Sequence, residues 1–285
     1  MWKLTPPDTN SLREELHEAL TLRDGTPVYA LSESEKESLI CLYEVYDQKL
    51  GRASEELEAK ELGERLRNAM YDAYSQVQVR GRLKRLRDQI KSLATVCPYC
   101  GFGEIKDLDH HLPRSKYKVL AIYPKNLVPS CGPCNNKKRA VADDEPNGQF
   151  FHTYLDTVPE VIFFIANAKL ENGALEVTFS VDAEALPEDV YQRMAFQIDR
   201  MELNIRYKAA ISTYLSSQLT AFEMVYGVEG GSEKLKRFLL SSANSEGKIY
   251  GNNDWRPALM RGLAICSEFC NGGFRKALGA VIPGA

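Results

Sequence analysis

Apolar residues recur at helical spacing through most of the first 94 residues and again through the last 100 or so. In the first part, they predict helices over residues 11–24 and 32–50 and a long helical stretch over residues 54–93 that is broken near Gly81. In the last part, they predict helices over residues 188–203, 205–226, 233–240 and 257–269. Both ends of the chain are therefore predicted to be mainly helical.

Strand patterns lie between these helical parts. Residues 105–113 and 125–130 read as two short strands, and the chain from Cys134 to Ala142 reads as a helix. Further on, two apolar runs flank Asn172-Gly173, a pair that strongly favours a tight hairpin turn. The predicted fold is α+β, with an N-terminal helical module (1–94), a central core (95–155) and a C-terminal, mainly helical module with a β-hairpin (156–285).

Two serines are candidate helix starts. Ser11 is followed three residues later by Glu14, which predicts a reciprocal capping box. Ser32, in Ser-Glu-Ser-Glu, is predicted to open the second helix.

Composition narrows the protein class without naming a function. The chain has 285 residues, of which 44% are hydrophobic and 26% charged, as in ordinary globular proteins. It begins without an apolar secretory segment, and no apolar run reaches the roughly 20 residues that span a bilayer. We expect a cytoplasmic protein that does not enter a membrane.

Charge is distributed unevenly. Residues 1–62 carry 7 basic and 14 acidic residues, whereas residues 79–91 carry 6 basic and 1 acidic, and residues 97–142 carry 8 and 3. A basic middle in a chain of net charge −3 indicates a polyanionic ligand, although solvated helix faces would give the same pattern. The candidate nucleic-acid contacts are Arg80, Arg82, Lys84, Arg85, Arg87, Lys137, Lys138 and Arg139.

Four of the seven cysteines form two Cys-x-x-Cys pairs, Cys97/Cys100 and Cys131/Cys134. Four thiolates in two tight turns suit a tetrahedral structural zinc ion, and the absence of a strand–helix context argues against a redox motif. The remaining cysteines, Cys41, Cys266 and Cys270, are expected to be core residues. The gap between the pairs exceeds the ~15–20 residues of a plain zinc ribbon, so an insert lies between them.

The insert carries Asp109-His110-His111-Leu112-Pro113 and Asn126-Leu127, and the second cysteine pair continues into Asn135-Asn136-Lys137-Lys138. This ordered set over about residues 95–142 resembles the HNH endonucleases of the ββα-metal (His-Me finger) superfamily, in their zinc-binding four-cysteine version. The resemblance implies a zinc-stapled ββα core.

The same resemblance assigns roles to residues of the insert. It makes His110 the general base, Asp109 and Asn135 the ligands of one catalytic Mg²⁺ or Mn²⁺, and Asn126 the residue that orients the histidine loop. Asn135 stands where many members carry histidine. A register shift would instead make His111 the base. His152 is expected to be structural, with an approach to the site or to a DNA phosphate as the alternative.

The expected function is a metal-dependent endonuclease acting on DNA, with RNA not excluded. By analogy with HNH proteins of bacterial defence and mobile-element systems, a regulatory partner such as an ATPase is expected, and a homodimer would allow both strands to be cut. The alternative is a non-catalytic zinc-containing protein that binds nucleic acid or serves as a scaffold.

Overall fold

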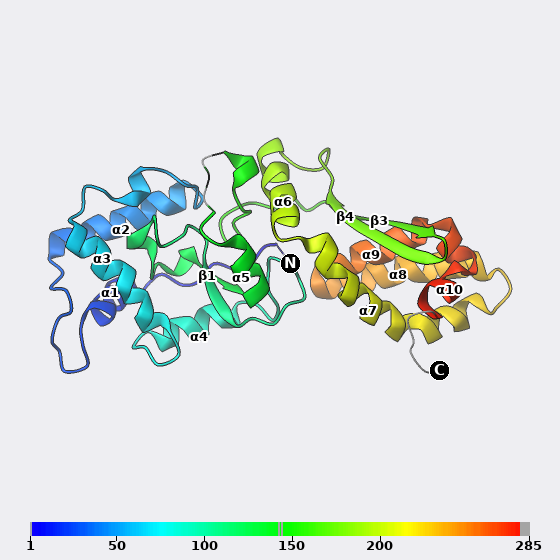
Figure 1. Ribbon diagram of the computed structural model, residues 1–285, viewed down its shortest axis with the longest axis horizontal. Coiled ribbons are helices and arrows are strands. Elements are labelled where there is room, and N and C mark those ends of the chain that lie inside the picture. Colours follow the sequence, from blue (N-terminus) through cyan, green and yellow to red (C-terminus); the bar gives the residue numbers. More distant parts are fainter. Residues whose placement is uncertain (1, 142, 144, 280–285) are drawn as a thin grey trace. The chain divides into compact units, whose positions relative to one another are not determined.

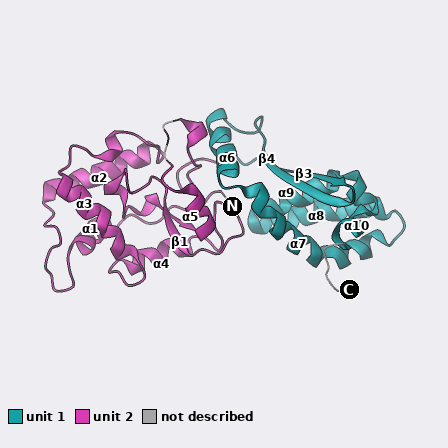
Figure 2. Cartoon of the chain, in the orientation of Figure 1, with its two compact units in different colours: residues 1, 159–285 teal, residues 2–158 magenta. Residues whose placement is uncertain are grey.

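The computed structural model describes residues 2–141, 143 and 145–279, and it divides the chain into two compact units (Figure 2). The N-terminal unit comprises residues 2–158, and the C-terminal unit is the described part of residues 159–285. The expected helical module (1–94) and central core (95–155) thus form one unit. Mixed helices with two small antiparallel sheets give an α+β fold, as predicted.

Helices of the N-terminal unit come first along the chain (Figure 1). They are α1 (Leu12–Leu20), α2 (Glu33–Gln48), α3 (Glu64–Ala73) and α4 (Lys84–Ser92), with 3-10 turns η1 (Glu56–Glu58) and η2 (Tyr74–Val77). The central segment then adds β1 (Asp107–His110), η3 (Lys118–Leu120), η4 (Pro124–Asn126), β2 (Leu127–Ser130), α5 (Gly132–Lys138) and η5 (Pro146–Gly148). A hairpin followed by a helix is the predicted order.

Local chemistry explains where the helices begin and end. Ser32 forms the reciprocal capping box with Glu35 at the start of α2. The box predicted at Ser11 is wrong, since its side chain makes no capping bond to α1. The helical stretch predicted over residues 54–93 is divided into η1, α3, η2 and α4, so it has breaks besides the one predicted near Gly81. At Gly81 itself, a Cβ would lie 2.0 Å from the Gln76 carbonyl oxygen, so the close backbone approach there requires glycine. Helix α5 ends at Lys138, and Ala142, its predicted end, lies outside the described residues.

One hydrophobic core joins the helices to the central segment. Tyr43 of α2 stacks on Tyr123, with ring centroids 4.3 Å apart, and Leu66 and Met70 of α3 are fully buried in the same cluster as Leu120. Burial of large side chains from both segments is the main favourable term in their association. The N-terminal helices are therefore the platform on which the central segment folds.

The C-terminal unit contains, among its described residues, the second hairpin, five α-helices and the short π-helix η6 (Phe269–Gly273). Strands β3 (Phe164–Glu171) and β4 (Ala174–Val181) pair through Asn172 and Gly173, whose φ values of 54° and 85° confirm the predicted turn. The helices are α6 (Glu188–Arg200), α7 (Leu203–Tyr226), α8 (Gly231–Tyr250), α9 (Trp255–Ile265) and α10 (Phe274–Gly279). Helix α8 runs ten residues past its predicted end at Leu240, because Ala243 continues its buried face.

The three cysteines outside the two pairs differ in burial. Cys266 and Cys270 are buried in the C-terminal unit, as expected of core residues, whereas the same expectation for Cys41 is wrong, because Cys41 is exposed on α2. Among the described helices, none is both long and apolar enough to cross a bilayer.

Candidate metal centre and nuclease site

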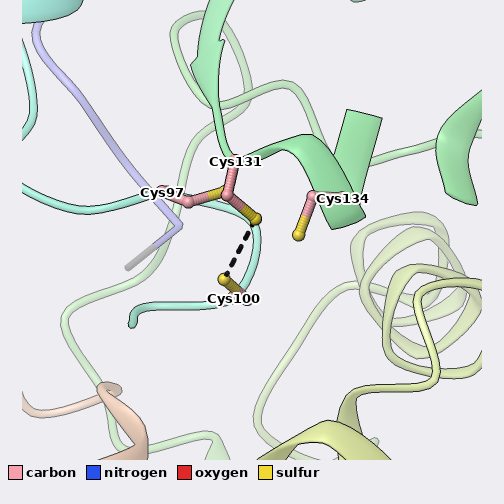
Figure 3. A group of neighbouring side chains, drawn as sticks. All are labelled: Cys97, Cys100, Cys131 and Cys134. Carbon is pink, nitrogen blue, oxygen red and sulfur yellow. Dashed lines mark hydrogen bonds between the residues drawn. The ribbon is translucent and has the colours of Figure 1, made fainter. Parts of the chain in front are cut away.

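The four paired cysteines converge from two turns (Figure 3). In the first turn, the amide of Gly103 donates to Cys100 Sγ at 3.3 Å, and Gly101 adopts φ 75°, which favours glycine. In the second, Cys131 occupies the position just before α5 and Cys134 lies in the first turn of that helix. A Cβ at Gly103 would lie 2.7 Å from Cys131 Sγ, so the two turns are closely packed at a glycine.

This cysteine cluster has the dimensions of a metal site. All four cysteines are buried, and their sulfur atoms lie within 4.8 Å of one another. Cys100 Sγ and Cys131 Sγ are 3.9 Å apart, close to the roughly 3.8 Å between sulfurs that each bond a tetrahedral zinc at ~2.3 Å. Hydrogen bonds from neighbouring thiols, Cys100 first, lower the pKa of Cys131 and favour its thiolate. The cluster can therefore bind a metal ion such as zinc.

Strand β1 and helix α5 place polar side chains against each other. In the β1–β2 register, Asp109 lies opposite Val128 and His110 opposite Leu127. Asp107 and Asp109 share one side of β1, because strand side chains alternate. On α5, Asn135 Nδ2 donates to Asp107 Oδ2 at 3.3 Å, and Lys138 Nζ lies 3.2 Å from Asp109 Oδ2.

Asp109 is a buried carboxylate with its own partners. Its Oδ2 accepts a hydrogen bond from the Tyr99 hydroxyl at 2.8 Å, and the fully buried Lys138 also donates to the His110 carbonyl at 2.6 Å. Burial raises the pKa of Asp109, which the Lys138 charge opposes. The phosphate contact predicted for Lys138 is corrected, because its ammonium is enclosed between these partners.

Oxygen donors of the predicted catalytic ion gather on this side of β1. The carboxylates of Asp107 and Asp109 and the amide of Asn135 are hard ligands of the kind that Mg²⁺ and Mn²⁺ prefer. In the structure, the Asp109 carboxylate pairs with the Lys138 ammonium, whereas the Asn135 amide contacts Asp107. The Lys138 ammonium therefore already neutralises charge at Asp109 Oδ2, which opposes the binding of a cation at that atom.

His110 lies on the opposite side of β1. Its Nε2 is 2.9 Å from the Ala121 carbonyl oxygen, and its ring packs 4.3 Å from that of Tyr74. Because a carbonyl only accepts, Nε2 carries the proton and Nδ1 is the nitrogen able to take one. The side chain is half-buried, and this burial lowers the pKa of His110 to about 3. The imidazole is therefore neutral at neutral pH.

Asn126 holds the loop that carries Ala121. Its Oδ1 accepts from the Leu112 amide at 2.8 Å, and its Nδ2 donates to the carbonyls of Leu112 and Leu120, each at 3.1 Å. The residue is fully buried. Asn126 thus fixes both ends of the segment between His110 and β2, which is the contact expected of a loop-orienting residue.

The other two histidines of this region are buried together. The His111 and His152 rings are 4.0 Å apart, and His152 Nε2 lies 2.8 Å from the Tyr46 hydroxyl. The backbone amide of Tyr154 donates to His152 Nδ1 at 3.2 Å, and burial lowers the pKa of His152. These contacts agree with the structural interpretation of His152 rather than with a DNA contact.

The predicted basic residues separate into two groups. Arg82 donates to the carbonyls of Glu18 and Ala19, and Arg87 is buried against the Lys106 carbonyl. The burial of Arg87 corrects its assignment as a phosphate contact, whereas Arg82 stays half-buried and its assignment remains a prediction. The remaining members keep at least partial exposure: Arg80, Lys84, Arg85, Lys137 and Arg139, with Lys84 paired to Asp88.

Several side chains at the site are not among the predicted site residues. Tyr46, Tyr74 and Tyr99 contact Asn126, His110 and Asp109, respectively. Arg114, from the insert itself, lies over Tyr74. Apolar periodicity marks Tyr46 and Tyr74 as core positions, and no signal in the sequence indicates that their polar or aromatic groups meet the motif.

Comparison with known proteins adds one similarity. Over 142 residues, the chain is 32% identical to Protein ea31 of Escherichia phage lambda, and the match covers 47% of this chain. The chain spans about half the length of that relative, 46%. No known protein family and no solved structure matches the chain.

Proposed function

We propose that this protein is an HNH endonuclease that hydrolyses phosphodiester bonds in DNA, with RNA as a second substrate to be tested. The observation that carries the proposal is the setting of His110. With Nε2 on the Ala121 carbonyl and the loop fixed by Asn126, the imidazole is held in the tautomer whose Nδ1 accepts, as a general base requires. The ordered set of HNH-like motif residues over about residues 95–142 supports the same conclusion.

In this proposal, the chain's own residues supply base, scaffold and ligands. His110 Nδ1 accepts the proton of the water that attacks the phosphorus, while Asn126 and the Ala121 carbonyl keep the ring oriented. Asp109 and Asn135 hold Mg²⁺ or Mn²⁺, which when bound neutralises charge on the phosphate and the leaving oxygen. The four cysteines hold a structural zinc ion that pins β1 and β2 to α5 and takes no part in the chemistry.

A second function has one specific observation in its favour. The ammonium of Lys138 already neutralises Asp109, as expected of a protein that keeps the HNH architecture without the catalytic ion. Such a protein would bind nucleic acid or a partner through a zinc-stabilised scaffold and would not cut.

Digestion of supercoiled, linear and single-stranded DNA separates the two functions. Each substrate is incubated with the zinc-loaded protein in Mg²⁺, in Mn²⁺ and without added divalent ion. The nuclease proposal expects nicked or linear product only with the divalent ion, and a binder shifts the DNA without cutting it. Equal cutting with and without the ion would contradict the assignment of Asp109 and Asn135.

The proposal also includes control of the nuclease by a partner protein. The acidic excess of residues 1–62 offers a surface for a regulatory protein such as an ATPase, and a homodimer would bring two sites to the two strands. Co-purification of a larger protein supports the regulated form. A monodisperse monomer that is active without a partner would contradict it.

A further inference from the structure

A cationic side chain lies between two aromatic rings beside the candidate site. The guanidinium carbon of Arg114 is 4.5 Å from the ring centroid of Tyr71 and 4.9 Å from that of Tyr74. Tyr71 belongs to α3 and Tyr74 begins η2, so the two rings project from successive turns of the N-terminal helices. We call Tyr71, Tyr74 and Arg114 the arginine cage.

Tyr74 fixes the arginine cage next to His110. Its hydroxyl donates to the Leu108 carbonyl of β1 at 2.9 Å, and the same ring packs 4.3 Å from the imidazole of His110. One aromatic ring thus contacts both the candidate base and the guanidinium. The cage is therefore attached to the strand that carries the motif.

Among the described residues, no hydrogen bond or ion pair uses the guanidinium of Arg114. The side chain is half-buried, and within the described part of the chain Arg114 has ring contacts but no hydrogen bond or ion pair. Arg82 and Arg87, by contrast, each bind backbone carbonyls. Stacking engages the face of a guanidinium and leaves the N–H groups on its edge available for a phosphate.

We propose that the arginine cage is a phosphate-binding subsite for the DNA strand at His110. Arg114 binds a backbone phosphate through its N–H edge, and Tyr71 and Tyr74 hold the guanidinium in place. Because two rings already restrict the side chain, less conformational entropy is lost when the phosphate binds. The inference rests on the proposed function for the identity of the strand, and its test measures binding separately from cutting.

Binding of a short fluorescein-labelled DNA duplex is measured by fluorescence anisotropy over a range of salt concentrations. His110→Ala is the parent protein, so that no cleavage occurs. Arg114→Ala is expected to weaken binding about tenfold and to reduce the slope of log affinity against log salt by about one, as for the loss of one phosphate contact. Arg114→Lys keeps the charge, so the slope should return while the affinity recovers only in part.

Two further variants distinguish a specific effect of the arginine cage on DNA binding from the loss of one positive charge. Arg65→Ala removes an equal charge from α3 outside the cage and should leave affinity and salt slope near those of the parent. Tyr71→Ala removes one wall of the cage, so affinity should fall severalfold with the slope retained. Thermal melting and zinc content confirm that each variant is folded.

The outcomes separate this inference from the proposed function. Equal affinity and salt slope in Arg114→Ala and its parent, or equal losses in Arg65→Ala, would overturn the subsite. DNA binding that depends on Arg114, in a protein whose His110-intact form never cuts, would keep the subsite and refute the nuclease.

Discussion

The Tyr46 hydroxyl connects two buried side chains that the HNH-like motif alone would not relate. It lies 2.8 Å from His152 Nε2 and 3.1 Å from Asn126 Oδ1. Gly51 permits this contact, since a Cβ there would lie 2.2 Å from the His152 ring. Helix α2 thereby supports the loop that positions His110, so the N-terminal helices belong to the site.

Tyr46→Phe tests this support. Loss of the hydroxyl removes the partner of the buried His152 Nε2, while Asn126 Oδ1 keeps the Leu112 amide, and should cost about 1–3 kcal/mol in the free energy of unfolding. We also expect DNA cleavage to slow about tenfold, since the loop at Ala121 loosens. Nitrogen NMR of His110 should then show a smaller fraction of the Nε2–H tautomer.

Tyr43→Phe is the matched control for Tyr46→Phe. It removes a buried hydroxyl from the same helix that donates to the Val119 carbonyl and does not contact Asn126. Equal effects of the two variants on the His110 tautomer would contradict a specific role for Tyr46.

Glu15 provides a prediction about pH. Burial, with the nearby Glu18 and Asp8 charges, raises the pKa of Glu15 to about 7. Since the folded state holds the proton more tightly, stability is highest below the unfolded pKa, near 4.5, and falls as pH rises through about 7. Glu15→Gln should therefore stabilise the protein at pH 8 by about 1 kcal/mol, after allowance for solvent screening, and change little at pH 5.

Urea unfolding of Glu15→Gln at both pH values gives the comparison, and Glu61→Gln, an exposed carboxylate that is not among the charges acting on Glu15, is its control. A gain at pH 5 equal to that at pH 8 would show that the carboxyl does not titrate in this range.

At the level of single residues, spacing predicted which side chains gather but not what they contact. Four cysteines at x-x spacing converge because each turn presents two sulfurs to one point. Lys138 was expected at the surface, where most lysines lie, and only the packing of α5 on β1 shows it buried against Asp109. Arg114 belongs to no apolar helix or strand pattern in the sequence, and the tyrosines of its cage lie about 40 positions earlier in the chain.

At the level of elements, local chemistry predicted the hairpins well. Asn172-Gly173 requires positive φ at both positions and therefore fixes a two-residue turn. The 54–93 stretch was less predictable, because one helical pattern is shared by α3, η2 and α4 and the breaks depend on close backbone approach at Gly81. The central ββα element is short, with strands of four residues, and depends on the cysteine cluster and the α2–α3 platform.

Removal of the metal tests this element. We expect zinc to be bound by the purified chain, and Cys131→Ser to lose it and to melt at a lower temperature, because metal binding contributes directly to folding. Cys270→Ser, which alters a buried cysteine in the C-terminal unit, should keep its zinc. Metal analysis by inductively coupled plasma mass spectrometry, with circular dichroism melting, provides both readouts. Retention of zinc by Cys131→Ser would contradict the four-cysteine site.

At the level of the whole molecule, the motif and its supports all lie in the N-terminal unit, residues 2–158. The similarity to Protein ea31 of phage lambda covers less than half of each chain. Helical periodicity predicted that the C-terminal unit is mainly helical, but no residue pattern in that unit indicates a chemical function. The proposed activity therefore rests on residues 97–138 and on the helices packed against them.

Cleavage of supercoiled plasmid by wild type and His110→Ala tests the central claim most directly. In Mg²⁺ or Mn²⁺, wild type should convert the plasmid to nicked or linear form. His110→Ala should lose at least about 100-fold in rate, as expected for removal of a general base, while zinc content and melting temperature stay near those of wild type. Cleavage by His110→Ala at the wild-type rate would contradict the account.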